Sequence, residues 1–282
     1  MKSLLISLFI ILMTIFPSAN EKVKLISFNI RYGTADDGKN SWAFRKGVLF
    51  DFIREENADF LGLQEAMIFQ IEEIIQHCPG YRYVGRTRQA DGSSGEATPI
   101  LYKPEKYNLI HQETVWLSEM PDIPESKSWD SSLPRIFTWA HFKRKKDQRD
   151  LIVYNTHYDH IGETARFESS KLIISHMASR HKGSDIVLLG DFNALEGSNP
   201  IQHLSKNEKM PLKDSYRSLH TVKKERDMTF YGWKEHTPGT GRRIDYIFYA
   251  GNLQPLEVHV SDFHQENRYP SDHMPVVANF KW

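Results

Sequence analysis

The feature that most limits how this chain can fold is an apolar run, residues 186–189, that ends abruptly in polar residues. The run is Ile-Val-Leu-Leu, and Gly190, Asp191, Phe192 and Asn193 follow it. An uninterrupted apolar run of this length is typical of a strand buried on both faces. A carboxylate and a carboxamide directly after it indicate a functional site at the end of the strand. Glycine and asparagine also form ordinary turns, so this motif alone leaves both interpretations open.

The same arrangement recurs at the ends of other apolar segments. Polar residues that close or follow such segments are Asn29, Glu65, His157 with Asp159, Asp191 with Asn193, Asp245, and Asp272 with His273. Each has an ordinary explanation as a turn residue, a carboxylate in a first helical turn, or a half-buried histidine. Burying so many polar groups separately is costly, because each charge needs a partner. We therefore expect these side chains to converge on a single cleft.

Length and composition allow one large domain or two small ones. The chain has 282 residues, of which 40% are hydrophobic, enough for a substantial core. Its 36 basic residues balance 36 acidic ones, so it lacks the basic excess typical of unspecific nucleic-acid binding. The basic run Lys143 to Lys146 fits a hairpin tip better than a phosphate-binding patch. Cys78 is the only cysteine, which excludes an intramolecular disulfide.

The N-terminus has the layout of a secretory signal. Lys2 precedes an apolar run from Leu4 to Phe16, and residues 17–19, Pro-Ser-Ala, supply small residues for cleavage. The run is short for a membrane span. We expect residues 1–19 to be a cleaved signal peptide and residues 20–282 to form the mature domain, without a transmembrane span, in the periplasm or secreted. An uncleaved anchor is the alternative.

Hydrophobic periodicity predicts many strands and a few interspersed helices. Helices are expected after Ser41, with an apolar face of Phe44, Val48, Phe52 and Ile53, and over residues 67–75 and 163–181. Strands are expected over residues 23–30, 60–65, 81–85, 99–103, 114–118, 136–143, 151–156, 186–189, 244–249, 256–261 and 274–280. This mixture predicts an α/β or α+β sandwich built as one domain.

The middle of the chain has two further features, a long irregular segment and two tryptophans in predicted strands. The long irregular segment 119–133 is of the kind that is often functional in compact domains. Trp116 and Trp139 fit core positions in strands better than a stacking surface for a base or a sugar. The sequence contains neither a Gly-x-x-x-x-Gly-Lys loop nor a Gly-x-Ser-x-Gly elbow, so nucleoside-triphosphate binding and serine-hydrolase chemistry lack their usual motifs.

The residue types at the strand ends point to one kind of chemistry. Carboxylates and carboxamides without cysteine suit a hard cation such as Mg²⁺, or Mn²⁺, rather than structural zinc. Histidines next to carboxylates suit general acid–base or oxyanion-binding roles. A hard metal ion together with such pairs is typical of phosphoester hydrolysis.

Taken in order, the motifs resemble those of a known superfamily. They are Ser-Phe-Asn29, Leu-Gln-Glu65, Asn-Thr-His157-Tyr-Asp159, Gly-Asp191-Phe-Asn193, Arg-Ile-Asp245-Tyr-Ile and Ser-Asp272-His273-Met-Pro-Val. This set is similar to that of the endonuclease/exonuclease/phosphatase superfamily, which includes pancreatic-type deoxyribonuclease, abasic-site endonucleases, inositol-polyphosphate 5-phosphatases, sphingomyelinases and deadenylases. The resemblance runs from about Val23 to the C-terminus. It implies an α/β fold, a four-layer α/β/β/α sandwich of two packed mixed sheets flanked by helices.

The resemblance also implies roles around a metal ion. Glu65 would be the main metal ligand, and Asn29 and Asp272 would complete or support the metal site. Asp191 would orient or deprotonate the attacking water, and Asn193 would hold the phosphate or the nucleophile.

Further roles concern the phosphate group. His273, oriented by Asp245, would stabilise the transition state or relay a proton. His157, paired with Glu96, would contact the phosphate from the other side. Arg135 stands where relatives present a phosphate-binding arginine, although a plain surface arginine at a strand start would fit the sequence as well.

These observations lead to three functional hypotheses. The first is an exported, Mg²⁺-dependent phosphoester hydrolase, a phosphodiesterase or phosphatase, that acts on a small-molecule or lipid-derived ester. The second is a secreted nuclease that degrades DNA or RNA. The third is a non-catalytic binding protein on the same fold. No obligate protein partner is inferred.

Overall fold

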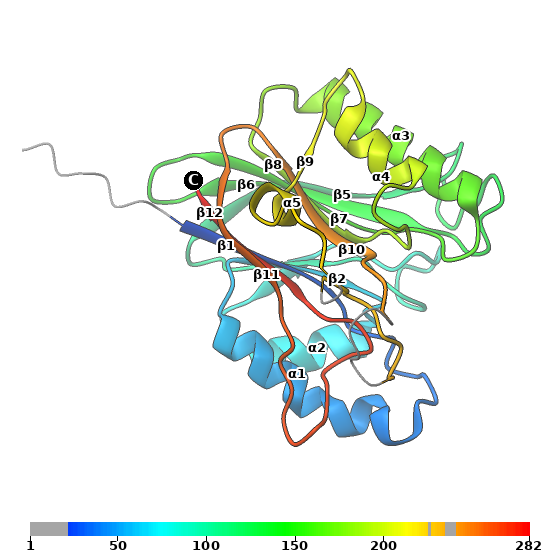
Figure 1. The fold of residues 1–282 in the computed structure, drawn as a ribbon, viewed down its shortest axis with the longest axis vertical. Coiled ribbons are helices and arrows are strands. Elements are labelled where there is room, and N and C mark those ends of the chain that lie inside the picture. The colour runs from blue at the N-terminus through cyan, green and yellow to red at the C-terminus, as the bar shows by residue number, and fades with distance from the viewer. Residues whose placement is uncertain (1–21, 225–226, 235–240) are drawn as a thin grey trace, which may run out of the picture.

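Two packed β-sheets with helices on their outer faces make up the described part of the chain, residues 22–224, 227–234 and 241–282 of a computed structural model (Figure 1). The four layers are those of the predicted α/β/β/α sandwich. The expected signal peptide, residues 1–19, lies outside the described residues. Among the described residues, no helix has the length and apolar character needed to cross a bilayer.

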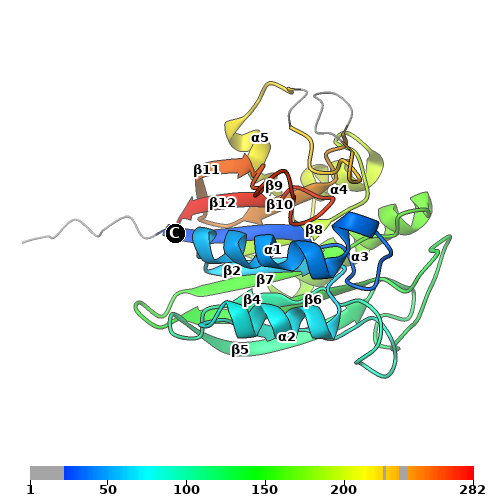
Figure 2. The same cartoon turned by 90° about the horizontal axis from the view of Figure 1, so that it is seen from below.

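The first sheet carries the N-terminal strand near its centre. Its order is β11 (Gln254–Val260), β12 (Val276–Lys281), β1 (Lys22–Asn29), β2 (Phe60–Gln64), β4 (Ile100–Tyr102), β3 (Arg82–Val84). Strands β1 and β2 are parallel, and the other neighbours are antiparallel. Helices α1 (Trp42–Glu56) and α2 (Ile68–His77) cover its outer face, as Figure 2 shows from below.

The second sheet is built around the apolar run noted above. Its order is β5 (Tyr107–Trp116), β6 (Ile136–Arg144), β7 (Asp150–His157), β8 (Ile186–Asp191), β10 (Asp245–Ala250), β9 (Lys213–Asp214). Helices α3 (Glu163–Arg180) and α4 (Asn199–Lys206) lie on its outer face, and the short α5 (Ser215–Leu219) follows β9.

Strand direction brings the polar strand ends to one edge. Parallel strands present their carboxyl ends at the same edge of a sheet, and β7 and β8 are parallel, with His157 opposite Asp191. Strand β10 runs the other way, and its first residue, Asp245, pairs with Asp191. In the first sheet, Asn29 at the end of β1 pairs with Gln64 at the end of β2.

A buried polar bridge joins the two sheets close to this edge. Asn155 of β7 donates to the carbonyl oxygens of Leu63 and Pro99, and its own oxygen accepts from Gln64 of β2. A Cβ added at Gly62 would lie 2.8 Å from that oxygen, so glycine is required there for the sheets to approach. The rest of the space between the sheets is apolar and includes Leu25, Phe60, Val153, Leu189 and Ile247.

The inner face of α1 differs from the predicted one. Phe44 is 56% exposed, whereas Arg45 is completely buried. The helical period places Trp42, Arg45, Leu49 and Phe52 on the inner face, so Phe44 points about 100° away from Arg45. Ser41 occupies the N-cap position, but its side chain makes no capping hydrogen bond.

Several elements were not predicted, and each is short or exposed. Helices α4 and α5 and strand β9 span only eight, five and two residues, fewer than the window of 11–18 residues over which a period is read. Residues 108–112 of β5 are exposed and are held by pairing with β6, so this stretch lacks an alternating apolar pattern. The basic run Lys143 to Lys146 does form the hairpin between β6 and β7, and Trp116 and Trp139 are buried.

Candidate active site

A cavity of about 450 Å³ lies where the polar strand ends meet. Most residues singled out from the sequence line it, namely Glu65, Glu96, Arg135, His157, Asp191, Asn193, Asp272 and His273. Asn29 and Asp245 lie directly behind this lining and are hydrogen-bonded to it. Residues that are distant in sequence therefore share one site.

Three lining residues adopt left-handed backbone conformations within two residues of a strand end. Arg31 follows β1 with a φ of 55°, Glu65 follows β2 with a φ of 55°, and Asn193 follows β8 with a φ of 46°. Asparagine tolerates this region, but arginine and glutamate adopt it rarely, at a cost of roughly 1–3 kcal/mol each. Such strain persists where the surrounding contacts require it, and it concentrates at functional sites.

Asn29 connects the carboxylates of the two sheets. Its amide nitrogen donates to Glu65 Oε1 at 3.0 Å and to Asp191 Oδ2 at 2.9 Å. Its oxygen accepts from the backbone N–H of Arg31 at 3.0 Å, which fixes the orientation of the amide. In this arrangement Asn29 supports the carboxylates, and its oxygen is already engaged.

Glu65 and Asp272 form an acidic wall that fits a divalent cation. The remaining oxygen of Glu65, Oε2, accepts from the backbone N–H of Tyr32. Burial and the nearby charge of Glu65 raise the pKa of Asp272, although His273, Arg31 and Arg45 oppose this. The negative charges of the two carboxylates repel each other, and a cation between them would relieve this repulsion. Their oxygen atoms are ligands of the type that Mg²⁺ or Mn²⁺ prefers.

Asp191 lies at the centre of the site and is only 1% exposed. Its Oδ1 accepts from the backbone N–H of Asn193 at 2.9 Å. Burial and the charge of Asp245 raise the pKa of Asp191 to about 7, against the opposing effects of His273 and Asn29. A carboxyl group with a pKa in this range is suited to accept a proton near neutral pH.

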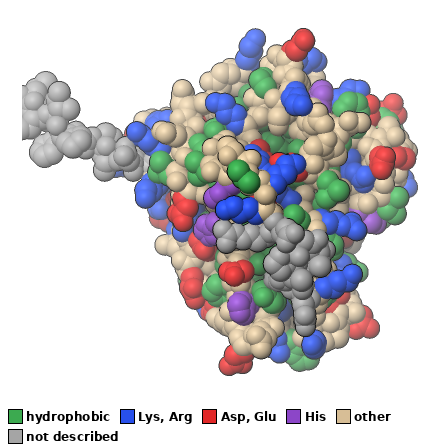
Figure 3. Space-filling model, in the orientation of Figure 1, with side chains coloured by type: hydrophobic (Ala, Val, Ile, Leu, Met, Phe, Trp, Pro, Cys, Tyr) green, Lys and Arg blue, Asp and Glu red, His purple; other side chains and the backbone are tan. Residues whose placement is uncertain are grey.

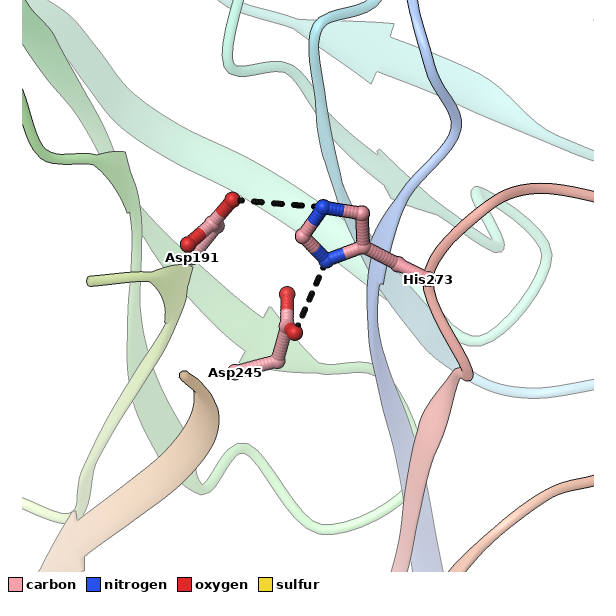
Figure 4. Close-up of side chains that lie close together, drawn as sticks. All are labelled: Asp191, Asp245 and His273. Carbon is pink, nitrogen blue, oxygen red and sulfur yellow. Dashed lines mark hydrogen bonds and ion pairs between the residues drawn. The ribbon is translucent and has the colours of Figure 1, made fainter. Parts of the chain in front are cut away.

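His273 lies between two aspartates, as Figure 4 shows. Its Nδ1 is 2.9 Å from Asp245 Oδ2, and its Nε2 is 3.8 Å from Asp191 Oδ2. Burial lowers the pKa of His273, but the charges of Asp245, Asp191 and Asp272 outweigh it and raise the pKa to about 10. A raised pKa favours the protonated ring, in which both nitrogens donate hydrogen bonds. The three side chains suit proton transfer or anion binding, and their ligand atoms also lie close enough together to hold a metal ion.

Arg135 and His157 form the opposite wall. Arg135 is 5% exposed, so it is not a surface arginine. Its Nη1 donates to Nδ1 of His157 at 3.1 Å, and Nε2 of that ring is 3.1 Å from Asn193 Nδ2. Burial and the charge of Arg135 hold the pKa of His157 well below its ordinary value. The wall thus has one fixed positive charge beside a neutral imidazole.

Glu96 lines the cavity but does not have the expected partner. Its carboxylate forms a two-pronged ion pair with Arg88, at 2.8 Å and 3.1 Å, rather than with His157. The reason is geometric, since Nδ1 of His157 is occupied by Arg135 and Nε2 faces Asn193.

Other charged residues of the site were missed from the sequence. Arg45 donates to the carbonyl oxygens of Ile30, Arg31, Asn40 and Pro270, and so joins three loops that border the site. His160 and Arg31 line the cavity. None of the three residues directly ends an apolar run. The only available signal was that His160 follows Asp159 and that Arg31 lies close to Asn29 in the sequence.

Comparisons with known proteins agree with this architecture. The model of the endonuclease/exonuclease/phosphatase family matches residues 26–273. The crystal structure of a Bacteroides vulgatus endonuclease/exonuclease/phosphatase superposes with a TM-score of 0.86 at 30% identity, over 92% of this chain and 98% of that one. A mannosyl-6-phosphatase of Bacteroides thetaiotaomicron gives a TM-score of 0.77 at 30% identity, over 92% of this chain and 100% of that one.

More distant curated relatives are longer proteins. The probable CCR4-Not complex 3'-5'-exoribonuclease subunit Ccr4 of Encephalitozoon cuniculi is 26% identical over an alignment that covers 92% of this chain. The chain spans 62% of that relative's length. The family match covers most of the chain and includes every residue that lines the cavity. This protein belongs to the endonuclease/exonuclease/phosphatase family.

Proposed function

We propose that this protein is an exported, divalent-metal-dependent hydrolase of small-molecule phosphate esters. Members of its family are hydrolases that act on phosphoesters, and family enzymes use divalent metals. The observation that carries the proposal is the meeting, in one cavity, of an acidic wall, a buried base and a cationic wall. The acidic wall is Glu65 with Asp272, the buried base is Asp191, next to His273, and the cationic wall is Arg135 with His157.

Each wall has a distinct task in the proposed reaction. A cation held by Glu65 and Asp272 would neutralise charge on the phosphate. Asp191, in its ionised form, takes a proton from the attacking water. Arg135 binds a non-bridging oxygen, and Asn193 orients the phosphate or the water. The imidazolium of His273, held by Asp245, places its Nε2–H where negative charge develops on an oxygen of the substrate.

The cavity favours a small substrate. Its volume, about 450 Å³, is in the ordinary range for sites that enclose a small molecule. The structural relative from Bacteroides thetaiotaomicron is named as a mannosyl-6-phosphatase, which makes a hexose 6-phosphate the first substrate to test. A lipid-derived phosphate ester is the second.

A nuclease is the other candidate, because several curated relatives are named as 3'-5'-exoribonucleases. Acidic and basic side chains are interspersed over the face seen in Figure 3, in keeping with the balanced composition. Oligoribonucleotide and plasmid substrates separate the two candidates, and nucleic-acid turnover that exceeds sugar-phosphate turnover would reverse their order. A non-catalytic binding protein is disfavoured because every residue of the motifs is present.

Export remains a separate proposal that rests on the N-terminal sequence. Fractionation of cells that express the full chain is expected to place the protein outside the cytoplasm, with an N-terminus near residue 20. A chain that starts at residue 20 is expected to stay in the cytoplasm. Cytoplasmic retention of the full chain would contradict export without affecting the proposed chemistry.

The activity is tested with purified protein and a panel of phosphomonoesters, phosphodiesters, nucleic acids and phospholipids. Each is assayed with Mg²⁺, with Mn²⁺ and with a chelator. The expected result is turnover of at least one small ester that requires the cation and is lost in Asp191→Asn. Asp150→Asn, at a surface hairpin, is the matched control and is expected to keep wild-type turnover.

A further inference from the structure

His160, an exposed histidine that lines the cavity, has a protein partner for one ring nitrogen and none for the other among the described residues. Its Nδ1 is 3.0 Å from Nη2 of Arg135. The Nε of Arg135 lies 3.5 Å from Asp159, so the guanidinium is held between two histidines and a carboxylate. The position of the His160 ring is therefore set from its inner side.

This contact determines where the proton of His160 lies. A guanidinium only donates hydrogen bonds, so Nδ1 of His160 must accept and cannot carry a proton. The neutral ring then has its proton on Nε2. Burial and the charge of Arg135 lower the pKa of His160, which agrees with a neutral ring.

The loop that carries His160 is held by hydrogen bonds to the side chain of Asp159. Asp159 accepts from the backbone N–H groups of Ile161 and Gly162 with one oxygen. Its other oxygen accepts from the hydroxyl and the backbone N–H of Ser132. These bonds fasten the end of β7 to segment 119–133, and they fix His160 at the mouth of the cavity.

The outer nitrogen has no partner in the protein. Among the residues that the structure describes, none accepts a hydrogen bond from Nε2 of His160, although the residue lines the cavity beside Arg135. Because His160 is exposed and lines the cavity beside the buried Arg135, this N–H is accessible and suited to bind an oxygen of an anionic ligand.

We propose that His160 is a substrate-binding residue whose Nε2–H donates to a terminal phosphate group, so that the site prefers phosphate monoesters to diesters. The inference rests on the proposed phosphoester hydrolysis and adds the class of ester. A monoester dianion has three non-bridging oxygens, and a diester has two. Arg135, Asn193 and a bound cation supply partners for two oxygens, and His160 supplies one for the third.

Two substitutions separate substrate binding from support of Arg135. In His160→Asn, the amide oxygen takes the place of Nδ1 and still accepts from Arg135, but the outer donor is lost. In His160→Gln, the amide reaches the position of Nε2 and keeps a donor there, but the contact with Arg135 is lost. His111→Asn, an exposed histidine on β5, is the matched control.

The assay compares 4-nitrophenyl phosphate with bis(4-nitrophenyl) phosphate, which share a leaving group. His160→Asn is expected to lower kcat/KM for the monoester by about 10- to 100-fold, mainly through KM, and to change the diester by less than about threefold. The inhibition constant of inorganic phosphate is expected to rise by a similar factor. His160→Gln is expected to lie closer to the wild type than His160→Asn does.

Each other result contradicts a stated part of the proposal. If His160→Gln is the weaker variant, His160 acts only by positioning Arg135. If the two esters lose activity equally, the monoester preference is wrong. If His160→Asn matches the wild type on both esters and in phosphate inhibition, the inference fails while the proposed function stands. A wild-type protein that hydrolyses no ester of the panel removes both proposals. Thermal unfolding checks that each variant is folded.

Discussion

His273 donates from Nδ1 to Oδ2 of Asp245 across 2.9 Å, although the two residues lie 28 positions apart in the chain. Asp245 begins β10 of the second sheet, and His273 lies in the loop that leads into β12 of the first sheet. Both side chains are at most 5% exposed. The pair therefore depends on how the sheets are packed, and it holds the imidazolium in a single orientation at the edge of the cavity.

Replacement of Asp245 by asparagine tests this orientation. The neutral amide removes the charge that stabilises the imidazolium, so kcat is expected to fall by on the order of 10²–10⁴-fold with a much smaller change in KM. Steady-state kinetics measure the effect. Asp150→Asn is the control, and an Asp245→Asn enzyme with kcat near that control would show that the pair is structural only.

Arg45 is expected to matter for stability more than any exposed arginine. Its guanidinium satisfies four buried or half-buried carbonyl oxygens, and burial lowers its own pKa to about 10. Arg45→Met is expected to lower the free energy of unfolding by roughly 3–5 kcal/mol, because these acceptors lose their partner. Urea unfolding measures the loss. Arg54→Met, on the same helix, is the control, and equal effects for the two variants would contradict this account.

A buried histidine outside the cavity predicts a pH dependence of stability. Nδ1 of His176 is 2.8 Å from the hydroxyl of Tyr154, and burial lowers the pKa of His176 from 6.5 to about 3. Between pH 6.5 and about 3, His176 is protonated in the unfolded chain but neutral in the folded protein. Stability is thus expected to fall as pH decreases through this window, by up to about 1.4 kcal/mol per pH unit from this residue.

His176→Asn removes this contribution while it keeps an acceptor for Tyr154. The variant is expected to be less stable at pH 7, but its unfolding free energy should depend less steeply on pH between about 6.5 and 4 than that of the wild type. His111→Asn, with an exposed ring, should keep the wild-type slope. Parallel slopes for wild type and His176→Asn would contradict the assignment.

Metal binding is expected to stabilise the folded protein. At a cation concentration about 100 times the dissociation constant, linkage predicts a gain of about 2.7 kcal/mol. Glu65→Gln and Asp272→Asn should lose most of this gain. In chelator, either variant should be at least as stable as the wild type, because the repulsion between the two carboxylates is removed. Thermal unfolding with and without Mg²⁺ or Mn²⁺ measures both effects, and an undiminished gain in both variants would place the cation elsewhere.

Much of this architecture was predictable from local sequence. The apolar runs that end in Asp191 and Glu65 form buried strands, and their polar ends meet because parallel strands share an edge. These signals lie within a few consecutive residues. The predicted four-layer fold and the family resemblance are confirmed.

What could not be predicted depends on tertiary contacts. Glu96 pairs with Arg88 because Nδ1 of His157 already accepts a hydrogen bond from Arg135. This pairing depends on residues that are distant in sequence. The burial of Arg45 depends on carbonyl groups supplied by three separate loops. No local pattern encodes either contact.

The central claim is that Asp191 and the acidic wall beside it catalyse cation-dependent phosphoester hydrolysis. The most direct measurement is the turnover of 4-nitrophenyl phosphate or the best ester of the panel by wild type and Asp191→Asn, with Mg²⁺ and with chelator. We predict turnover by the wild type that the chelator abolishes, and a loss of at least about 10²–10⁴-fold in an Asp191→Asn variant that remains folded. Near-normal turnover by folded Asp191→Asn, or full activity in chelator, would contradict the account.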